Sequence, residues 1–331
     1  MAKTYTRRRA IAILAAAAGL PLLTGAKSVG RSVMWTGQAL GAPATLILNH
    51  RDETAARRLI ERIVSEVSRL ESVFSLYRED SALAELNRIG GLVAPPIELV
   101  SLLQASRGYW EATGGAFDPS VQPLWALYRK HFGMPDADAA GPSRSDIADT
   151  LSLVDFGAVK CDRNRIVIGS KMAITLNGVA QGYITDRIVE MLRDAGVTSS
   201  LVDMGEDRAI GAKADGSPWR IGLAESQDSG RPDNVLEIVN KAVATSSASG
   251  FHFDQAGRFG HILDPRKGHV PSLYKRITVV AEEAATADAL STAFTLMEEE
   301  SIASMVKRRG DIAVDLVRLD GIHARPGSSL G

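Results

Sequence analysis

The sequence predicts a protein of the α+β class, with helices packed on antiparallel β-sheet. Two observations carry this prediction. Short strand-like segments follow one another at close spacing after residue 199, as strands joined by turns do. An earlier stretch, 53–74, places apolar residues three or four positions apart, the pattern of a long helix with one face in a core. A second helix is expected over 97–113, ended by two glycines.

The other elements follow from turn signals and alternation. We expect a first strand over 42–49, a short capped helix over 82–87 and a hairpin over 163–176. A further helix should end near Gly196, and a flexible tail is expected over 320–331. The later strand candidates are 199–204, 219–223, 235–239, 241–245, 276–281 and 311–319.

The composition is that of a soluble globular protein. The chain has 331 residues, 45% of them apolar and 23% charged, which is enough for a sizeable core. Its formal net charge is −1; residues 1–26 contain four basic residues and no acid, so the remainder carries −5. This mild acidity, without a basic stripe, argues against a nucleic-acid partner. The single cysteine, Cys161, excludes an intramolecular disulfide.

Residues 1–26 have the pattern of an export signal. Arg7–Arg9 precede a 14-residue apolar run, which is shorter than the about 20 residues of a membrane span. Small residues offer a cleavage position after Ala26, and the adjacent arginines indicate the twin-arginine route. We therefore expect a periplasmic protein, associated with the inner membrane if the signal is not cleaved. A buried or amphipathic N-terminal helix is the alternative interpretation.

The stretch that begins at Thr286 reads as the first turns of a helix. Thr286 is a good N-cap, and Asp288 falls in the first turn, where the helix dipole favours a negative charge. Asp288 and Thr292 are four positions apart and share one face. Their carboxylate and hydroxyl are oxygen ligands of the kind that Mg²⁺ or Ca²⁺ accepts. From this stretch alone, helix capping and packing are the favoured interpretation.

Three other turns contain residue types that could face a ligand. Two glycines lead into Asp118, a glycine-rich turn over 177–183 enters a helix, and His261 stands three residues before Asp264. Glycine lets backbone approach a ligand closely, and a helix N-terminus can hold an anion. Taken singly, each turn is better explained as ordinary helix entry or a structural corner.

Together, and in this order, five segments resemble the ApbE family of FAD:protein FMN transferases, over residues 35–319. The segments are 74–81 with Asn87, 114–119, 178–183 with Asp186, 261–265 with Gly268, and 287–292. Each is modest alone, but chance is a poor explanation for all five in the order of the family. Gln181 and the signal pattern are most similar to the NosX branch, which is associated with nitrous oxide reduction.

The resemblance implies an α+β, T-fold-like structure with antiparallel sheets flanked by helices. It also implies an enzyme that uses Mg²⁺ or Mn²⁺ to cleave FAD and joins FMN through a phosphoester to a Thr or Ser hydroxyl of another protein, with release of AMP. The expected acceptor is a flavoprotein subunit of an electron-transfer system in or near the membrane. Phosphoryl transfer of this kind depends mainly on positioning and charge neutralisation, which agrees with the residue types present.

Carried over by position, the resemblance assigns a role to each matching residue. Asp288, Thr292 and the backbone carbonyl of Gly178 would bind the metal, and Asp288 would thereby be catalytic. His261 matches the histidine proposed to activate the acceptor hydroxyl. The positions that match FAD contacts are Leu40, Tyr77, Ala116, Phe117, Asp118, Thr175, Gln181 and Ile262.

This sequence departs from the family pattern near the expected flavin contacts. Gln181 stands where the family usually has Lys, Thr175 where it has Asp, and Leu40 where it has Met. The first two changes alter the charge in opposite senses, which suggests that they compensate for each other. Glu206 and Ala248 replace a family Gly and Asp. Two alternatives therefore stay open beside a transferase: an FAD diphosphatase that uses water as acceptor, and a non-catalytic protein that binds or delivers FAD.

Overall fold

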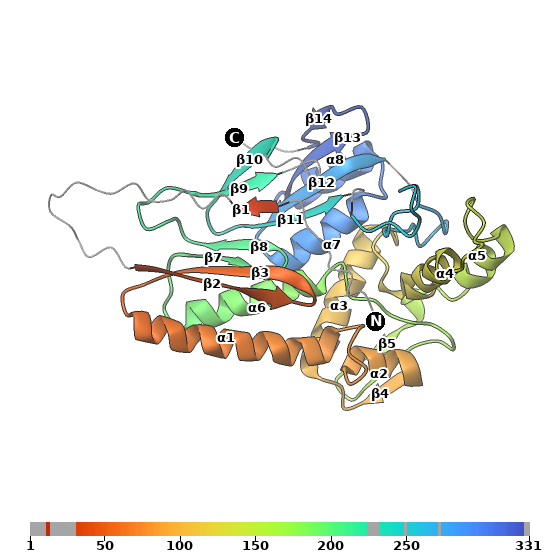
Figure 1. The fold of residues 1–331 in the computed structure, drawn as a ribbon, viewed down its shortest axis with the longest axis horizontal. Helices are drawn as coiled ribbons and strands as arrows, with labels where there is room; N and C mark the ends of the chain where they lie inside the picture. Colours follow the sequence, from red (N-terminus) through yellow and green to blue (C-terminus); the bar gives the residue numbers. More distant parts are fainter. Residues whose placement is uncertain (1–10, 14–30, 224–231, 248–249, 271–272, 328–331) are drawn as a thin grey trace.

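The computed structural model describes residues 11–13, 31–223, 232–247, 250–270 and 273–327 (Figure 1). Its centre is an eight-stranded sheet in the order β14-β13-β12-β11-β8-β7-β3-β2, and every neighbouring pair is antiparallel. The predicted antiparallel sheet is thus confirmed. The strands are β2 Arg31–Ala39, β3 Ala42–His50, β7 Ser200–Asp203, β8 Asp207–Ile210, β11 Ala242–Ser247, β12 Tyr274–Ala281, β13 Ala313–Arg318 and β14 His323–Ala324.

Two three-stranded sheets complete the β structure of the described residues. The first has the order β1-β9-β10 and the second the order β4-β6-β5. Their strands are β1 Ile11–Ile13, β9 Trp219–Leu223, β10 Asn234–Ile238, β4 Gly91–Val93, β5 Lys160–Cys161 and β6 Arg165–Val167. The remainder of the predicted export signal lies outside the described residues.

The helices confirm the α+β class. The predicted helix over 53–74 is observed with those bounds. No helix in the described part of the chain is both long and apolar enough to cross a membrane. The helices are α1 Glu53–Phe74, α2 Ala82–Ile89, α3 Ile97–Ala112, α4 Gln122–Phe132, α5 Arg144–Leu151, α6 Ala180–Asp194, α7 Ala284–Phe294 and α8 Glu299–Arg309.

The main sheet separates two apolar cores. Helix α1 lies along β2 and β3, α6 along β7 and β8, and α7 beside β11 and β12, with β9 and β10 on the opposite face of the sheet (Figure 1). Successive side chains of a strand point to opposite faces, so one strand serves both cores. In β12, Ile277 and Val279 join the core on the helical side, whereas Val280 joins the core under β9 and β10.

The predicted hairpin over 163–176 is only half correct. Its first half is β6, but β6 pairs with β4 and β5, and residues 168–176 form no strand. The side chain of Asn87 instead takes both backbone groups of Ile174: it accepts from the N–H at 2.7 Å and donates to the C=O at 2.8 Å. Backbone groups satisfied in this way are unavailable to a strand ladder.

The prediction of a flexible tail from residue 320 is wrong for its first part. His323 and Ala324 form β14, which pairs with β13 at the edge of the main sheet. Arg325 then donates to the buried carboxylate of Asp315 at 3.3 Å. An unpaired edge would leave the N–H and C=O groups of β13 exposed, and this short return of the chain covers part of it. Residues 328–331 lie outside the described part.

Candidate active site

Helix α7 begins with its backbone donors held by another helix. Ala284 and Ala285 donate their N–H groups to the two carboxylate oxygens of Asp186, at 2.8 and 2.9 Å. Glu283, at the N-cap position, makes no side-chain capping bond. Asp186 lies on α6 and is also paired with Arg208 of β8, both side chains being largely buried.

The prediction that Thr286 caps this helix is therefore wrong. Thr286 lies within the first turn, and its hydroxyl hydrogen-bonds to the hydroxyl of Tyr109 at 3.0 Å. The carboxylate of Asp186 satisfies two of the orphan donors and complements the helix dipole, so the helix begins earlier. Burial raises the pKa of Asp186 to about 6, against the opposing effects of Arg208 and the two N–H groups.

The three predicted metal ligands lie on facing elements. A Cβ added to Gly178, in the turn before α6, would stand 3.1 Å from Thr292 Oγ1 and 3.5 Å from Phe117 Cε2. Asp288, one turn before Thr292 on α7, is only 4% exposed, and its Oδ2 accepts the N–H of Gly182 at 3.1 Å. The fold therefore brings the turn at Gly178 against the α7 face that carries both side chains.

The chemistry of this donor set fits a hard divalent cation. A carboxylate, a hydroxyl and a backbone carbonyl are all oxygen donors, and Mg²⁺ commonly takes only one or two carboxylates from the protein and the rest from phosphates and water. Hydroxyls extend the polar surface beside Thr292: Ser246 Oγ lies 3.5 Å from Thr292 Oγ1 and 2.9 Å from Ser291 Oγ. Among the described residues, no group of three or more His, Cys, Asp or Glu side chains could hold a metal.

The segment that contains Ala116, Phe117 and Asp118 packs beside Gly178. Ala116 and Phe117 are buried, and the Phe117 ring lies edge-on to that of Tyr109 with centroids 5.9 Å apart. The next residue, Asp118, is held by its own local bonds. The backbone of Thr175 joins the same region, because its N–H donates to the carbonyl of Pro119 at 2.8 Å.

The carboxylate of Asp118 is occupied by protein donors. It accepts from Trp110 Nε1 at 3.0 Å, and from the N–H and hydroxyl of Ser120 at 2.7 and 2.5 Å. Burial raises the pKa of Asp118, although these hydrogen bonds favour its ionised form. For the carboxylate itself, the contacts match the alternative interpretation of a structural turn.

His261 is oriented by the backbone of its own loop. Its Nδ1 lies 3.0 Å from the carbonyl oxygen of Phe251, which also accepts the His261 backbone N–H at 3.0 Å. Because a carbonyl oxygen only accepts, Nδ1 must carry the proton, and Nε2 is then the acceptor atom of the neutral ring. Ile262, the next residue, is half-buried against the helical-side core.

Asp264 and Arg266 connect this loop to the end of α7. Arg266 donates to Asp264 through its side chain, at 2.9 Å from both Nε and Nη2, and to the carbonyl of Leu296 at 2.8 Å. Burial alone would raise the pKa of Asp264, but the bonds from the side chain and backbone of Arg266 outweigh it and the pKa is lowered. The predicted structural corner is therefore an ionised pair that anchors the loop.

Three other predicted contact residues have very different surroundings. Leu40 has a φ of 49° in the tight turn between β2 and β3, and its N–H donates to Glu71 Oε1 of α1 at 2.7 Å. Tyr77, just after α1, is 73% exposed, so its ring is open to a stacking partner. Gln181 is buried, and a Cβ added to Gly205 would lie 2.5 Å from its Nε2. Leu40 and Tyr77 are therefore positioned by α1: Leu40 is bonded to it, and Tyr77 follows its last turn.

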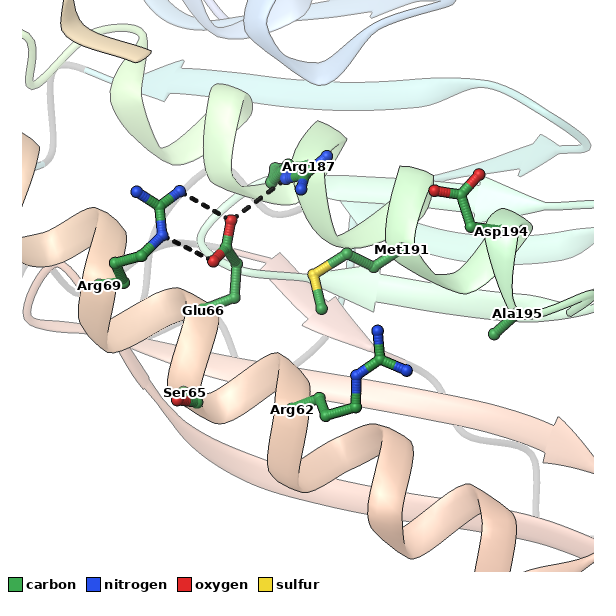
Figure 2. Close-up of a pocket in the computed structure, with 8 residues that line it drawn as sticks. All are labelled: Arg62, Ser65, Glu66, Arg69, Arg187, Met191, Asp194 and Ala195. Carbon is green, nitrogen blue, oxygen red and sulfur yellow. Dashed lines mark hydrogen bonds and ion pairs between the residues drawn. The ribbon is translucent and has the colours of Figure 1, made fainter. Parts of the chain in front are cut away.

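A groove elsewhere on the surface is not lined by any predicted site residue. It has a volume of about 580 Å³ and lies between α1 and α6 (Figure 2). Figure 2 shows Glu66 between Arg69 and Arg187, with N–O distances of 2.8 and 3.2 Å. These are partly exposed ion pairs, which contribute little to stability.

Asp186 and Asn87 belong to the family pattern, but the sequence alone indicates no role for either. The signal that could have found the role of Asp186 is its spacing: Gly178, Gly182 and Asp186 are four positions apart, and so are Ala284, Asp288 and Thr292. Nothing local in the sequence marks the partnership of Arg266 with Leu296.

Comparison with known proteins assigns this arrangement to a family. The sequence model of the ApbE family matches residues 40–316, most of the chain. The chain belongs to the ApbE family. A relative from Treponema pallidum (strain Nichols), named FAD:protein FMN transferase, is 28% identical over 284 residues, covering 78% of this chain and 76% of the relative. One of the same name from Haemophilus influenzae is 26% identical over 284 residues, with 82% and 80% covered.

Solved ApbE structures have the same fold. The apo form of the Pseudomonas stutzeri flavinyl transferase ApbE superposes with a TM-score of 0.77 at 25% identity, covering 92% of this chain and 97% of that one. The ApbE protein of Thermotoga maritima gives a TM-score of 0.78 at 27% identity, with 89% and 97% covered. The ApbE resemblance and the fold that it implies are therefore confirmed.

Proposed function

We propose that this ApbE-family protein is an FAD:protein FMN transferase whose site is built on α7 and on the turn at Gly178. The relatives that carry this name match most of the chain. The single observation that supports the location of the site is the approach of Gly178 to Thr292, with the buried Asp288 one turn away on the same helix.

The proposed reaction is the one that the ApbE resemblance implies, and the relatives carry its name. The acceptor hydroxyl oxygen forms a bond to the phosphorus of the FMN half of FAD, the bond from that phosphorus to the bridging oxygen breaks, and AMP leaves with that oxygen. His261 Nε2 takes the proton of the hydroxyl, since Nδ1 faces the carbonyl of Phe251. The exposed Tyr77 and the half-buried Ile262 supply aromatic and apolar surface for the flavin.

Mg²⁺, or Mn²⁺ in its place, would be held by Asp288, Thr292 and the carbonyl of Gly178. When bound, such an ion neutralises the diphosphate and the charge that develops on the leaving AMP. The protein contributes the positions of these three donors. We further propose a periplasmic location, from the export signal at 1–26, with the catalytic domain over 35–319. The acceptor would be a flavoprotein subunit of an electron-transfer system at the membrane.

One experiment tests the proposed activity. The mature protein is incubated with FAD, Mg²⁺ and an acceptor domain that carries a Ser/Thr flavinylation site. We expect acid-stable flavin fluorescence on the acceptor together with AMP. AMP without labelled acceptor would favour the diphosphatase, and tight FAD binding without AMP would favour a carrier.

The metal should bind weakly to the protein alone and much more tightly when FAD is present. The chain offers only one carboxylate among the three donors, so the diphosphate must supply much of the coordination. Isothermal titration with Mg²⁺ or Mn²⁺, with and without FAD, measures the difference. Equal affinity in the two titrations would contradict this coordination.

Thr175 and Gln181 are expected to be coupled in FAD binding. The Asp and Lys that usually occupy these positions would add one negative and one positive charge, so Gln181→Lys alone should change FAD affinity more than the paired change with Thr175→Asp. A double-mutant cycle on the FAD dissociation constant measures the coupling, which is of the order of 0.5–3 kcal/mol for residues that interact. Additive effects would show that the two departures are independent.

A further inference from the structure

Helices α6 and α7 meet in an antiparallel arrangement at three levels. Asp186 binds the N–H groups at the start of α7, Gly182 donates its N–H to Asp288, and Gly178 lies against Thr292. From one contact to the next, the residue number falls by four on α6 and its entry turn and rises by four on α7. The last two levels hold the predicted metal ligands, and the first does not.

Each helix satisfies the N-terminus of the other. Gly182 is the third residue of α6, so its N–H is one of the orphan donors of that helix, and Asp288 accepts it. The orphan donors of Ala284 and Ala285 on α7 go to Asp186 in return. Neither helix has a side-chain bond from its own N-cap residue.

The three contacts differ in how strongly they fix the register of α7 against α6. Gly182 packs backbone to backbone, since a Cβ there would lie 2.4 Å from the carbonyl oxygen of Ala284. Such contact is close but contains few directional bonds. Asp186 supplies two bonds to α7 and is itself fixed by its ion pair with Arg208. A one-residue slip of α7 would break both bonds and turn Asp288 and Thr292 by about 100° about the helix axis.

We propose that Asp186 is a positioning residue for the metal half of the site: by capping α7 from α6 it sets the register that presents Asp288 and Thr292 to the turn at Gly178. This inference rests on the proposed function. In this role its carboxylate acts through α7, since both of its oxygens accept backbone N–H groups of that helix. Removing it therefore lowers metal affinity in the presence of FAD, while the ligands themselves remain.

The test compares Asp186→Ala and Asp186→Asn with Asp52→Ala. Asp52 also accepts two backbone N–H groups at the start of a helix, but as the N-cap residue of α1 itself: its Oδ1 accepts from Thr54 and Ala55 at 2.8 and 3.1 Å, away from the site. Mn²⁺ binding is followed by electron paramagnetic resonance with FAD present. We expect Asp186→Ala to weaken Mn²⁺ binding by about 10- to 100-fold, the range found for residues that orient metal ligands. Asp186→Asn keeps one acceptor oxygen, so its Mn²⁺ affinity should lie between those of Asp186→Ala and the wild type. Asp52→Ala should bind Mn²⁺ as the wild type does.

A second measurement needs neither metal nor FAD. Hydrogen exchange at the Gly182 amide reports whether Asp288 still faces it, and Asp186→Asn is used if Asp186→Ala does not fold. Loss of protection at Gly182 in the Asp186 variants, but not in Asp52→Ala, supports the proposal. Unchanged protection at Gly182 overturns it. A wild-type protein that binds no Mn²⁺ with FAD would count against the proposed function alone, because the exchange measurement still decides the role of Asp186.

Discussion

Asp288→Ala is expected to lower kcat/KM for flavin transfer by about 1,000-fold, equivalent to about 4 kcal/mol of transition-state stabilisation. Asp288 is the only carboxylate among the three proposed metal ligands, and without it the site presents only a hydroxyl and a backbone carbonyl. The measurement is the rate of acceptor labelling over a range of Mg²⁺ concentrations. Full Mg²⁺-dependent transfer by the variant would show that the metal assignment is wrong.

Asp288→Asn separates the fold from the chemistry in the same experiment. The amide oxygen of asparagine can still accept the N–H of Gly182, which Asp288 accepts at 3.1 Å. The stability of the Asp288→Asn variant to urea should therefore stay near that of the wild type, whereas its transfer rate should fall because the negative charge is lost. A variant that loses stability and activity together would point to a structural role for Asp288, the interpretation that its own stretch of sequence favoured.

Gly182→Ala should be among the most destabilising single substitutions in the protein. The new Cβ would lie 2.4 Å from the carbonyl oxygen, 2.5 Å from the carbonyl carbon of Ala284 and 2.6 Å from Ala285 Cα. All three are backbone atoms of α7, so no side chain can rotate away and the two helices must separate. We expect a loss of about 3 kcal/mol or more in the free energy of unfolding, measured by urea denaturation followed by circular dichroism.

Gly108→Ala is the matched control for this change. Gly108 lies within α3, and a Cβ there would meet nothing within 4 Å. Alanine in a helix interior is favoured over glycine by about 0.5–1 kcal/mol, so this variant should be slightly more stable than the wild type. Equal losses in the two variants would mean that the close contact between α6 and α7 does not limit stability.

Much of the secondary structure could be predicted because its causes are local. The spacing of apolar residues predicts the long helix over 53–74, and the alternation of apolar and polar residues between turns predicts the strands. Two local predictions were wrong because distant groups intervened. Asn87 occupies the backbone of Ile174 and prevents a second hairpin strand, and β14 forms because β13 presents an open edge.

In the site, too, local patterns were predictable from the sequence and contacts between distant segments were not. By itself, the sequence determined the donor types: a carboxylate and a hydroxyl four residues apart on a helix, a glycine-rich turn, and a histidine in a corner. The ordered family pattern grouped them. Only the tertiary structure decided how they meet, because the meeting depends on contacts between segments about 100 residues apart in the chain. Asp186 takes the capping place that Thr286 held in the prediction, and Asp118 uses its carboxylate on its own turn. A residue type fixes which bonds a side chain can make, but the fold decides which partner reaches it first.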